Sequence, residues 1–347
     1  MENLDAVFAA HFARYPKAGV QDFAKLAYQN TFGPGHMIAD PASARAFLHR
    51  EAQSARRLPR EASPEPIGCG FFRLHLGAER DFSDDAAAAL FFLTAAAPAG
   101  SVQALSEKLR SIERLSKAGE LPGRAEAWCL AYRAAGYPAL HHTRAYREAY
   151  APAYRVVSDS ALRFVPVLRA IDRLLREKDT VTVAIEGGSA SGKSTFGKAL
   201  ADAYDANLFH MDDFFLRPEQ RTPARYAEPG GNVDYERFAR EVLVPMRQNV
   251  PFDYRVFDCG TMRLGKRVSV RPKKLRIVEG AYSRHPSFGD PYDLKLFLGV
   301  DPVTQSARIR ERNGEKMLEK FLGTWIPYEN TYFAAYDIIG TSDFAVF

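Results

Sequence analysis

The chain has 347 residues, of which 46% are apolar and 26% charged, and this balance is ordinary for a globular protein long enough for about two domains. Its cysteines, Cys69, Cys129 and Cys259, are widely spaced and odd in number, which argues against a disulfide framework or a paired-cysteine metal site. No apolar run reaches the roughly 18 residues of a membrane span, and the first residues lack the basic and apolar regions of a secretion signal. We therefore expect a cytoplasmic protein with no membrane partner.

The formal net charge is +5, and the whole excess lies in residues 1–178. A surplus of this size is compatible with an anionic partner, but it does not by itself indicate nucleic-acid binding.

Residues 1–178 are predicted to be mainly helical, because apolar residues recur at three- or four-residue spacing in five segments that turn signals separate. The segments are Val20–Gln29, Ala42–Gln53, Asp84–Ala95, Val102–Lys117 and Arg124–Ala135, and the turns are Phe32–Gly35, Ser63–Pro66 and Leu121–Gly123. A further helix is expected from about residue 160 to 177. The first half thus reads as a helical domain with no assigned role.

Histidines and interleaved aromatic residues are the candidate functional features of this half. His36 follows a Gly-Pro-Gly turn and His141 precedes His142, but no cysteine or acid stands at metal-ligand spacing from them. Tyrosines alternate with arginines between residues 132 and 155, a pattern that can stack on nucleotide bases but is more typical of helices with rings packed inward. Structural roles are favoured, and a nucleic-acid partner for this half stays open.

After Lys178 the pattern changes to alternating strands and helices. Strands are predicted at Val181–Ile185, Asn207–His210, Leu275–Val278, Leu294–Val300 and Ser342–Phe347, and helices at Lys193–Ala203, Asp234–Gln248, Pro302–Arg312 and Glu315–Tyr336. Such alternation is typical of a parallel sheet with helices on both faces. We therefore predict an α/β domain over residues 179–347, preceded by a mainly α-helical domain over residues 1–178.

The first of these strands leads directly into a phosphate-binding motif. Residues 187–194 fit G-x-x-x-x-G-K-[ST] at every fixed position, and a predicted helix follows. Glycines let backbone N–H groups surround phosphate oxygens, and the helix N-terminus adds its positive dipole. We expect Lys193 to reach the β- and γ-phosphates and the Ser194 hydroxyl to bind Mg²⁺. The residues predicted to hold ATP are Gly187, Gly188, Ser189, Ala190, Ser191, Gly192, Lys193, Ser194 and Thr195.

Acidic residues follow two of the other predicted strands. Asp212 and Asp213 come directly after the strand that ends at His210, and Glu279 ends the strand that begins at Leu275. The carboxyl ends of parallel strands face the crevice in which ligands bind. An aspartate there can accept the proton of an attacking hydroxyl, and Glu279 can lie beside Mg²⁺ or its water shell.

The segment from about residue 180 to 347 resembles the uridine kinase and phosphoribulokinase family of P-loop kinases. The resemblance rests on the P-loop together with Asp212–Phe215, Asn232–Asp234, Val278–Gly280 and an arginine-rich segment after Asp301. It implies a P-loop NTPase fold with a five-stranded parallel core, ATP and Mg²⁺ as cofactors, and a lid that carries arginines.

By position, the resemblance also implies roles for individual residues. Asp212 matches the catalytic base, Asp234 an acid that holds the acceptor's hydroxyls, and Glu279 the acid near Mg²⁺. Arg308 and Arg312 stand four residues apart on one helix face and match the catalytic arginines of the lid. A solvated helix face is the alternative for these arginines.

The acceptor pocket departs from the family pattern. Nucleoside kinases of the family carry Tyr-Asp-Phe-x-x-His, whereas this chain has Tyr254 and Arg255 in a stretch without the histidine, and Tyr235 replaces a histidine that usually follows the acid. Asp213 stands where the family often has a small residue, so the base is either Asp212 or Asp213. We expect Asp213, Asp234, Tyr254 and Arg255 to contact the acceptor.

Two functions of different classes fit these observations. The first is an ATP-dependent kinase for a small hydroxylated metabolite, with uridine or cytidine as the simplest acceptors. The second is a nucleotide-dependent switch or an RNA-associated P-loop ATPase, in which residues 1–178 bind a partner. Asp234 favours a kinase, because a switch needs no acceptor pocket. The identity of the acceptor and the oligomeric state do not follow from the sequence.

Overall fold

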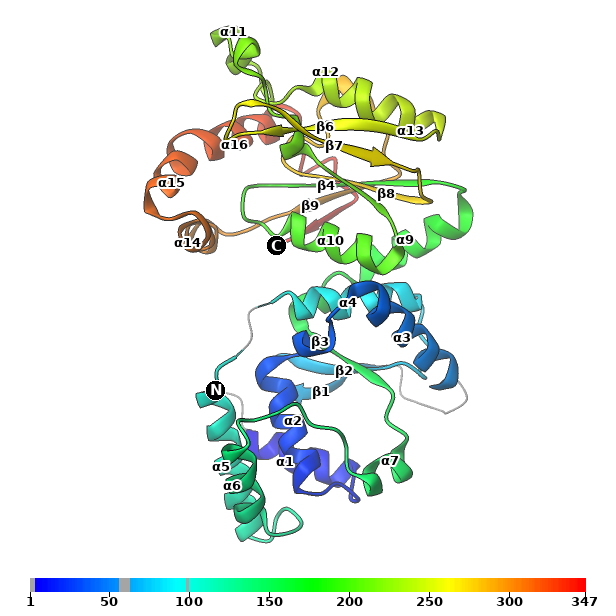
Figure 1. The fold of residues 1–347 in the computed structure, drawn as a ribbon, viewed down its shortest axis with the longest axis vertical. Coiled ribbons are helices and arrows are strands. Elements are labelled where there is room, and N and C mark those ends of the chain that lie inside the picture. Colours follow the sequence, from blue (N-terminus) through cyan, green and yellow to red (C-terminus); the bar gives the residue numbers. More distant parts are fainter. Residues whose placement is uncertain (1–3, 56–62, 98–99) are drawn as a thin grey trace. The chain divides into compact units, whose positions relative to one another are not determined.

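The computed structural model describes residues 4–55, 63–97 and 100–347, and the chain forms two compact units, Met1–Pro166 and Val167–Phe347 (Figure 1). The sequence placed the boundary near residue 178, after helix α9 (Val165–Glu177) rather than at its start. Helix α9 lies in the second unit, where Ile171 is fully buried and Asp172 accepts a hydrogen bond of 2.9 Å from the hydroxyl of Tyr204. The division therefore falls where α9 begins.

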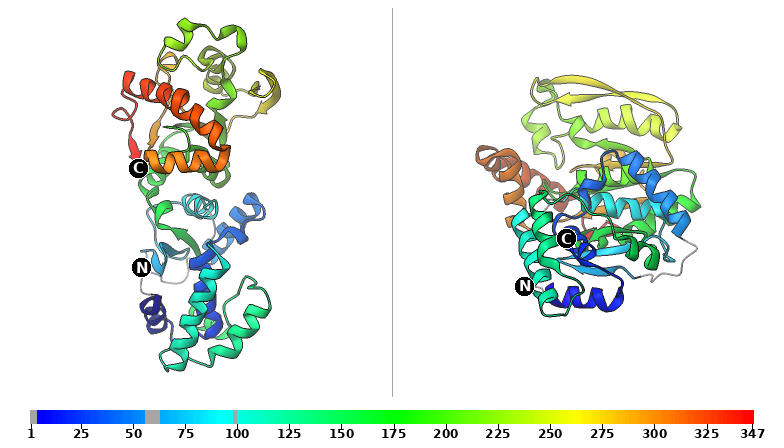
Figure 2. Two further views of the ribbon diagram at one scale, coloured as in Figure 1. Left: turned by 90° about the vertical axis from the view of Figure 1, so that its left-hand side faces the viewer. Right: turned by 60° about the horizontal axis from the view of Figure 1, so that its bottom comes forward.

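The first unit is largely helical, and all five helices predicted for it are present. Its helices are α1 (Leu4–Arg14), α2 (Val20–Phe32), α3 (Pro41–Ala55), α4 (Asp84–Ala95), α5 (Val102–Lys117), α6 (Ala125–Ala134), α7 (Arg144–Tyr150) and α8 (Asp159–Leu162), with a 3₁₀ turn, η1 (Gly35–Met37). Figure 2 shows α5 and α6 packed side by side. Their contact helps to enclose a core that includes Phe23 and Leu26 of α2 and Leu109 of α5.

This unit also contains a small antiparallel sheet that the sequence analysis missed. Strands β1 (Glu65–Gly68), β2 (Phe71–His75) and β3 (Tyr154–Ser158) are ordered β1-β2-β3. The strands are short, and the prolines around β1 indicated a turn. Strand β3 pairs with β2 although it lies almost 80 residues further along the chain. Pairing between such distant segments cannot be recognised from the residues of either strand alone.

The second unit is built on a five-stranded, all-parallel sheet in the order β10-β9-β4-β8-β5. The strands are β4 (Val181–Gly187), β5 (Asn207–His210), β8 (Leu275–Glu279), β9 (Leu294–Leu298) and β10 (Phe344–Val346), and all five were predicted. Strand β4 is buried along its whole length between β8 and β9. Strands β8 and β5 lie on one side of β4, and β9 and β10 lie on the other. In parallel sheets, ligands bind where the strand order reverses in this way.

Helices cover both faces of this sheet (Figure 1). The helical elements are α10 (Lys193–Tyr204), α11 (Pro223–Ala227), α12 (Tyr235–Phe238), α13 (Val244–Gln248), α14 (Pro302–Asn313), α15 (Glu315–Lys320) and α16 (Ile326–Ala335), the 3₁₀ turns η2 (Met211–Phe214), η3 (Pro218–Gln220) and η5 (Pro286–Phe288), and the π-helical turns η4 (Ala239–Leu243) and η6 (Phe321–Trp325). Helix α10 lies against β4, β5 and β8. On the other face, Phe238 and Met246 of α12 and α13 share a core with Phe209 of β5.

Two predicted long helices are interrupted by the π-helical turns. The helix predicted from Asp234 to Gln248 contains η4, and the one predicted from Glu315 to Tyr336 contains η6. A proline follows shortly after each π-helical turn, Pro245 in one case and Pro327 in the other. Proline has no N–H to complete the regular hydrogen-bond ladder, which favours a change of helical register at these points.

A two-stranded antiparallel hairpin of β6 (Phe252–Asp258) and β7 (Arg263–Val270) was not predicted. Both strands are rich in charged residues, and a register shift between Arg255 and Phe257 breaks the period-2 alternation of β6, so that Tyr254 and Phe257, three residues apart, are both buried. The described chain has no disulfide among its three cysteines. Within residues 4–55, 63–97 and 100–347, no helix is long and apolar enough to cross a bilayer.

Candidate active site

The phosphate-binding motif lies at the carboxyl end of β4, where the chain turns into α10. Gly192 has a φ of 99° directly before α10, a conformation that a side chain would strain. A Cβ on Gly187 would lie 2.2 Å from the carbonyl oxygen of Leu298, because β9 runs beside β4. The hydroxyl of Ser191 is buried and has no hydrogen-bond partner among the described residues. A glycine-lined loop with an unsatisfied donor fits a phosphate chain.

The first residues of α10 are the predicted phosphate and metal ligands. The Lys193 ammonium is nearly buried and donates a hydrogen bond of 2.8 Å to the carbonyl of Gly188, so it folds over the loop. The Ser194 hydroxyl donates a hydrogen bond of 3.1 Å to Oε2 of Glu279. The structure thus brings the two predicted metal ligands together, and hydroxyl and carboxylate oxygens are the ligand types that Mg²⁺ prefers. Thr195 is exposed on the next position of α10.

Glu279 has a second partner that the sequence analysis did not assign. Strands β5 and β8 pair with His210 directly opposite Glu279, and the imidazole Nδ1 contacts Oε1 of that carboxylate. The hydrogen bond with Glu279 raises the pKa of His210. The sequence carried a signal for this role of His210. It ends a strand predicted to lie beside the P-loop, so its side chain is expected at the same edge of the sheet as Asp212.

The two aspartates in η2 have different surroundings. Asp212 is accessible to solvent and has no hydrogen-bond partner among the described residues, yet neighbouring protein atoms desolvate the carboxylate and raise its pKa. Asp213 accepts a hydrogen bond of 3.2 Å from the hydroxyl of Tyr254, and its backbone carbonyl accepts one of 2.6 Å from Arg237. Of the two, Asp212 is the carboxylate left open to an incoming hydroxyl.

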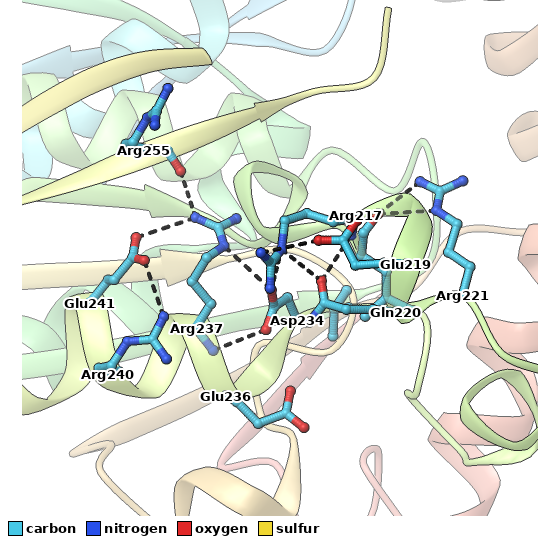
Figure 3. A network of polar contacts seen from close by, with 12 residues as sticks. Arg217, Glu219, Gln220, Arg221, Asp234, Glu236, Arg237, Arg240, Glu241 and Arg255 are labelled. Carbon is cyan, nitrogen blue, oxygen red and sulfur yellow. Dashed lines mark hydrogen bonds and ion pairs between the residues drawn. The ribbon is translucent and has the colours of Figure 1, made fainter. Parts of the chain in front are cut away.

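Asp234 is buried at the start of α12, only 2% exposed, and Figure 3 shows it among Arg217, Arg237 and their polar neighbours. Its Oδ1 accepts a hydrogen bond of 3.1 Å from the backbone N–H of Arg237, which makes it the N-cap of α12. Its Oδ2 is buried 3.6 Å from Nε of Arg237 and 3.9 Å from Nε of Arg217, and it accepts no hydrogen bond from the described residues. The structure therefore gives Asp234 a capping and charge-pairing role.

Tyr254 and Arg255 lie on opposite faces of β6. Tyr254 is buried and points to Asp213, as described above. Arg255 is exposed, and its guanidinium donates to the carbonyls of Leu264 at 2.6 Å and Gly265 at 3.4 Å on the paired strand. Successive side chains of a strand alternate between faces, so the structure brings Tyr254, but not Arg255, to the aspartates.

Helices α14 and α16 contact the P-loop through residues that the sequence analysis missed, with one exception. Gln305 donates a hydrogen bond of 2.8 Å to the carbonyl of Ser189, and the predicted Arg308 donates one of 3.0 Å to that of Ala190. The carboxylate of Glu329 accepts from both the N–H and the hydroxyl of Ser189, at 2.9 and 2.6 Å. Arg312 instead bonds to its neighbour Asn313 at 2.7 Å and does not reach the loop.

Glu186, the residue before the P-loop, is fully buried and fixes a neighbouring loop. It accepts hydrogen bonds from the backbone N–H groups of Tyr282 and Arg284 at 2.6 and 2.9 Å, and from the hydroxyl of Tyr332 at 3.2 Å. Burial raises its pKa to about 7. This carboxylate ties the loop after β8 and helix α16 to the strand that carries the P-loop.

Comparison with known proteins finds relatives of the C-terminal half of the chain among uridine kinases. Uridine kinases from Bacillus cytotoxicus and Geobacillus kaustophilus are each 23% identical to the chain, over 171 and 172 residues, which are 44% and 45% of this chain and 79% and 81% of theirs. The second unit is a distant homologue of uridine kinases. The family resemblance stated for this half is therefore confirmed. The first unit is an extra region that precedes the similar part.

No family model matches the chain. A solved structure of a "Possible Uridine Kinase" from Bacillus stearothermophilus superimposes with a TM-score of 0.41 and 16% identity, over 53% of this chain and 100% of the other.

Proposed function

We propose that the second unit transfers the γ-phosphate of ATP to a hydroxyl group of a small, nucleoside-like metabolite, with uridine and cytidine as the first acceptors to test. The observation that carries the proposal is the position of Asp212, which lies at the end of β5 with a raised pKa and no hydrogen-bond partner among the described residues. Lys193 and Glu279 are close enough to act on that pKa. A P-loop that serves only as a switch needs no open carboxylate there.

The residues divide into nucleotide-binding and acceptor-side groups. The glycine-lined loop and Lys193 would hold the phosphates, and Ser194 with Glu279 would hold Mg²⁺, which neutralises phosphate charge when bound. Asp212 would accept the proton of the attacking hydroxyl. Arg308 already contacts the loop from α14 and is suited to face developing negative charge. Positioning and electrostatics would then supply most of the rate enhancement.

An acceptor screen with radiolabelled ATP tests the proposal. The intact protein would be incubated with nucleosides, sugars and hydroxylated vitamins, and labelled products would be separated from ATP and phosphate. Transfer to uridine or cytidine that is lost in Asp212→Asn supports the proposal. Transfer to another hydroxylated metabolite would keep the kinase and replace the acceptor, whereas release of labelled phosphate without transfer to any acceptor would favour the ATPase alternative.

A further inference from the structure

A dense group of polar side chains lies inside the first unit, far along the chain from every P-loop residue. We call it the Arg73 cluster. It draws on α2, the β1-β2-β3 sheet, α7 and the segment before α7, and its members are Asp22, Lys25, Gln29, Glu65, Arg73, His142, Tyr146 and Tyr154. The kinase proposal uses none of them. Buried polar groups on this scale need either complete hydrogen bonding or a ligand.

Arg73 is completely buried, and no acid among the described residues lies within hydrogen-bond distance of its guanidinium. Its guanidinium donates to Oε1 of Gln29 at 3.1 Å and to the hydroxyl of Tyr146 at 3.3 Å, both neutral groups. Among the described residues, the nearest carboxylate is that of Glu65 at 3.7 Å, and Nε has no hydrogen-bond partner. The guanidinium lies over the ring of Tyr154, 4.6 Å from the ring centre, and against the effect of burial Tyr154, Tyr146 and Glu65 raise the pKa of Arg73. A buried guanidinium with five donors normally also meets an anion at hydrogen-bond distance, and no described residue supplies that partner.

The two acids of the cluster are occupied by other donors. Glu65 accepts a hydrogen bond of 2.7 Å from the hydroxyl of Tyr15 and contacts Nε2 of His75 at 2.9 Å. Asp22 accepts from the N–H of Gly19 and from both the N–H and the hydroxyl of Thr143, at 2.7 to 3.0 Å, and contacts Nδ1 of His142 at 2.8 Å. Four contacts use the whole acceptor capacity of a carboxylate.

Lys25 adds a second cation to this side of α2, because it stands one helical turn before Gln29, which contacts Arg73. It is half-buried, forms no ion pair within 4 Å with the described residues, and donates a hydrogen bond of 2.7 Å to the carbonyl of Leu140. Burial first, and then repulsion from Arg73, lower its pKa to about 8, and the attraction of Asp22 is the smaller effect. Two ammonium protons are therefore left for a ligand.

The aromatic rings beside these cations are packed against one another inside the protein and do not lie on its surface. His142 stacks on Tyr146 with ring centres 4.0 Å apart, and its Nε2 contacts the hydroxyl of Tyr154 at 2.6 Å. The face of the Tyr146 ring is covered by His142, so it is not open for a nucleotide base to stack on. Metal binding has no support either, because no cluster of three or more ligating side chains occurs in the described part of the chain.

We propose that Arg73 and Lys25, held by Gln29, Tyr146 and Tyr154, form a binding site for the phosphate or carboxylate group of a small metabolite. Such a group would give Arg73 the anionic partner that Glu65 does not supply at hydrogen-bond distance, and it would accept the remaining protons of Lys25. The site is separate from the P-loop and gives the extra unit a ligand-binding role of its own.

Protection of Lys25 from an amine-reactive ester tests this site directly. The intact protein would be kept with saturating Mg·ADP, so that the P-loop is occupied. The ester would then be added near pH 8 in three solutions of equal ionic strength, which contain inorganic phosphate, succinate or chloride. Peptide mass spectrometry would compare Lys25 with the exposed Lys17 of the same unit. At an anion concentration of about ten times its Kd, roughly a tenth of the sites stay open, so we expect about tenfold slower labelling of Lys25.

Gln29→Glu is the informative variant, because it keeps the acceptor that Arg73 already uses and places a fixed negative charge against it. It loses the amide donor to the Tyr154 hydroxyl, but that hydroxyl can donate to the new carboxylate. It should fold, as circular dichroism would verify, and lose anion protection of Lys25. Gln53→Glu, an exposed position on α3, carries the same charge change and should retain protection. Protection by phosphate alone would assign a phosphate group, and protection by succinate alone a carboxylate group. Equal labelling of Lys25 in all three solutions, or protection that survives Gln29→Glu, would overturn the proposal.

Discussion

The carboxylate of Glu329 is hydrogen-bonded to Ser189, so an acid from α16 occupies donors of the phosphate-binding loop. Glu329 is 6% exposed, and burial is the main cause of its raised pKa, against which the bonds from Ser189 and the charge of Lys193 act. Asp212 is close enough to raise the pKa further. Negative charge at this point opposes the arrival of a triphosphate.

We predict that Glu329→Gln tightens ATP binding. Removing one partly screened negative charge near the phosphates should be worth roughly 1 kcal/mol, or about fivefold in Kd. Isothermal titration with a non-hydrolysable ATP analogue measures the change. Ser189→Ala removes a donor without altering charge and should leave Kd within about twofold. Weaker binding by Glu329→Gln would show instead that the carboxylate braces the loop.

Lys193→Ala should lower phosphoryl transfer by at least about 10²-fold while the protein remains folded. The ammonium is the charged group of the loop, and its hydrogen bond to Gly188 shows that it lies over the phosphate cradle before any nucleotide arrives. Loss of preorganised charge stabilisation typically costs about 10²–10³ in kcat. Turnover and thermal unfolding would be measured together. Retention of most of the wild-type turnover would move the catalytic site away from the P-loop.

Asp212→Asn and Asp213→Asn should separate the two aspartates. An amide at 212 fills the same volume but cannot accept a proton, so kcat should fall by about 10²–10⁴ with little change in KM for ATP. Asp213→Asn keeps a partner for Tyr254 and should cost less. Steady-state kinetics of both variants decides the assignment, and a larger loss at position 213 would shift the base by one residue.

Asp234 combines an observed cap with a proposed acceptor contact, and two substitutions distinguish them. Asp234→Ala removes the cap of α12 and the charge beside Arg237, so the free energy of unfolding should fall by at least about 1 kcal/mol. Asp234→Asn preserves the cap. If Oδ2 holds acceptor hydroxyls, Asp234→Asn should raise the acceptor KM about tenfold and spare ATP. An unchanged KM would restrict Asp234 to structure.

Acid should destabilise the first unit between about pH 6.5 and pH 4. Burial lowers the pKa of His11 and of His142 to about 4, so in this window the unfolded chain binds protons that the folded chain does not. As the pH is lowered through this window, the free energy of unfolding therefore falls by up to ~2.7 kcal/mol per pH unit for the two histidines together.

Urea unfolding followed by the fluorescence of Trp128, in a Trp325→Phe background, isolates this unit. The substitution His142→Asn should remove about half of the slope. A midpoint that does not change from pH 6.5 to pH 4 would contradict the assignment.

Local patterns were sufficient for the sheet of the second unit and for the P-loop. The five strands, the glycine spacing of residues 187–194 and the acids at the carboxyl ends of β5 and β8 were all predicted. Each of these signals lies within a few consecutive residues, because strand burial, loop conformation and the position at a strand end are properties of a short segment.

Contacts between distant segments were not predictable in the same way. Glu329 is 140 residues from Ser189, and Gln305 is 116 residues from the same loop. The predicted Arg255 lies away from the aspartates because the pairing of β6 with β7 fixes which face it occupies.

The sequence by itself determined that residues 179–347 form a P-loop α/β unit. The reason is that the strand, the glycines and the lysine of such a loop are all encoded within a few consecutive residues. Only the tertiary structure decided which aspartate is open and which is bonded to Tyr254, that Asp234 caps a helix, and that Arg73 is buried 3.7 Å from its nearest acid. The physical reason is that burial and hydrogen-bond partners depend on the packing of segments far apart in the chain, and these set the charge and reach of each side chain.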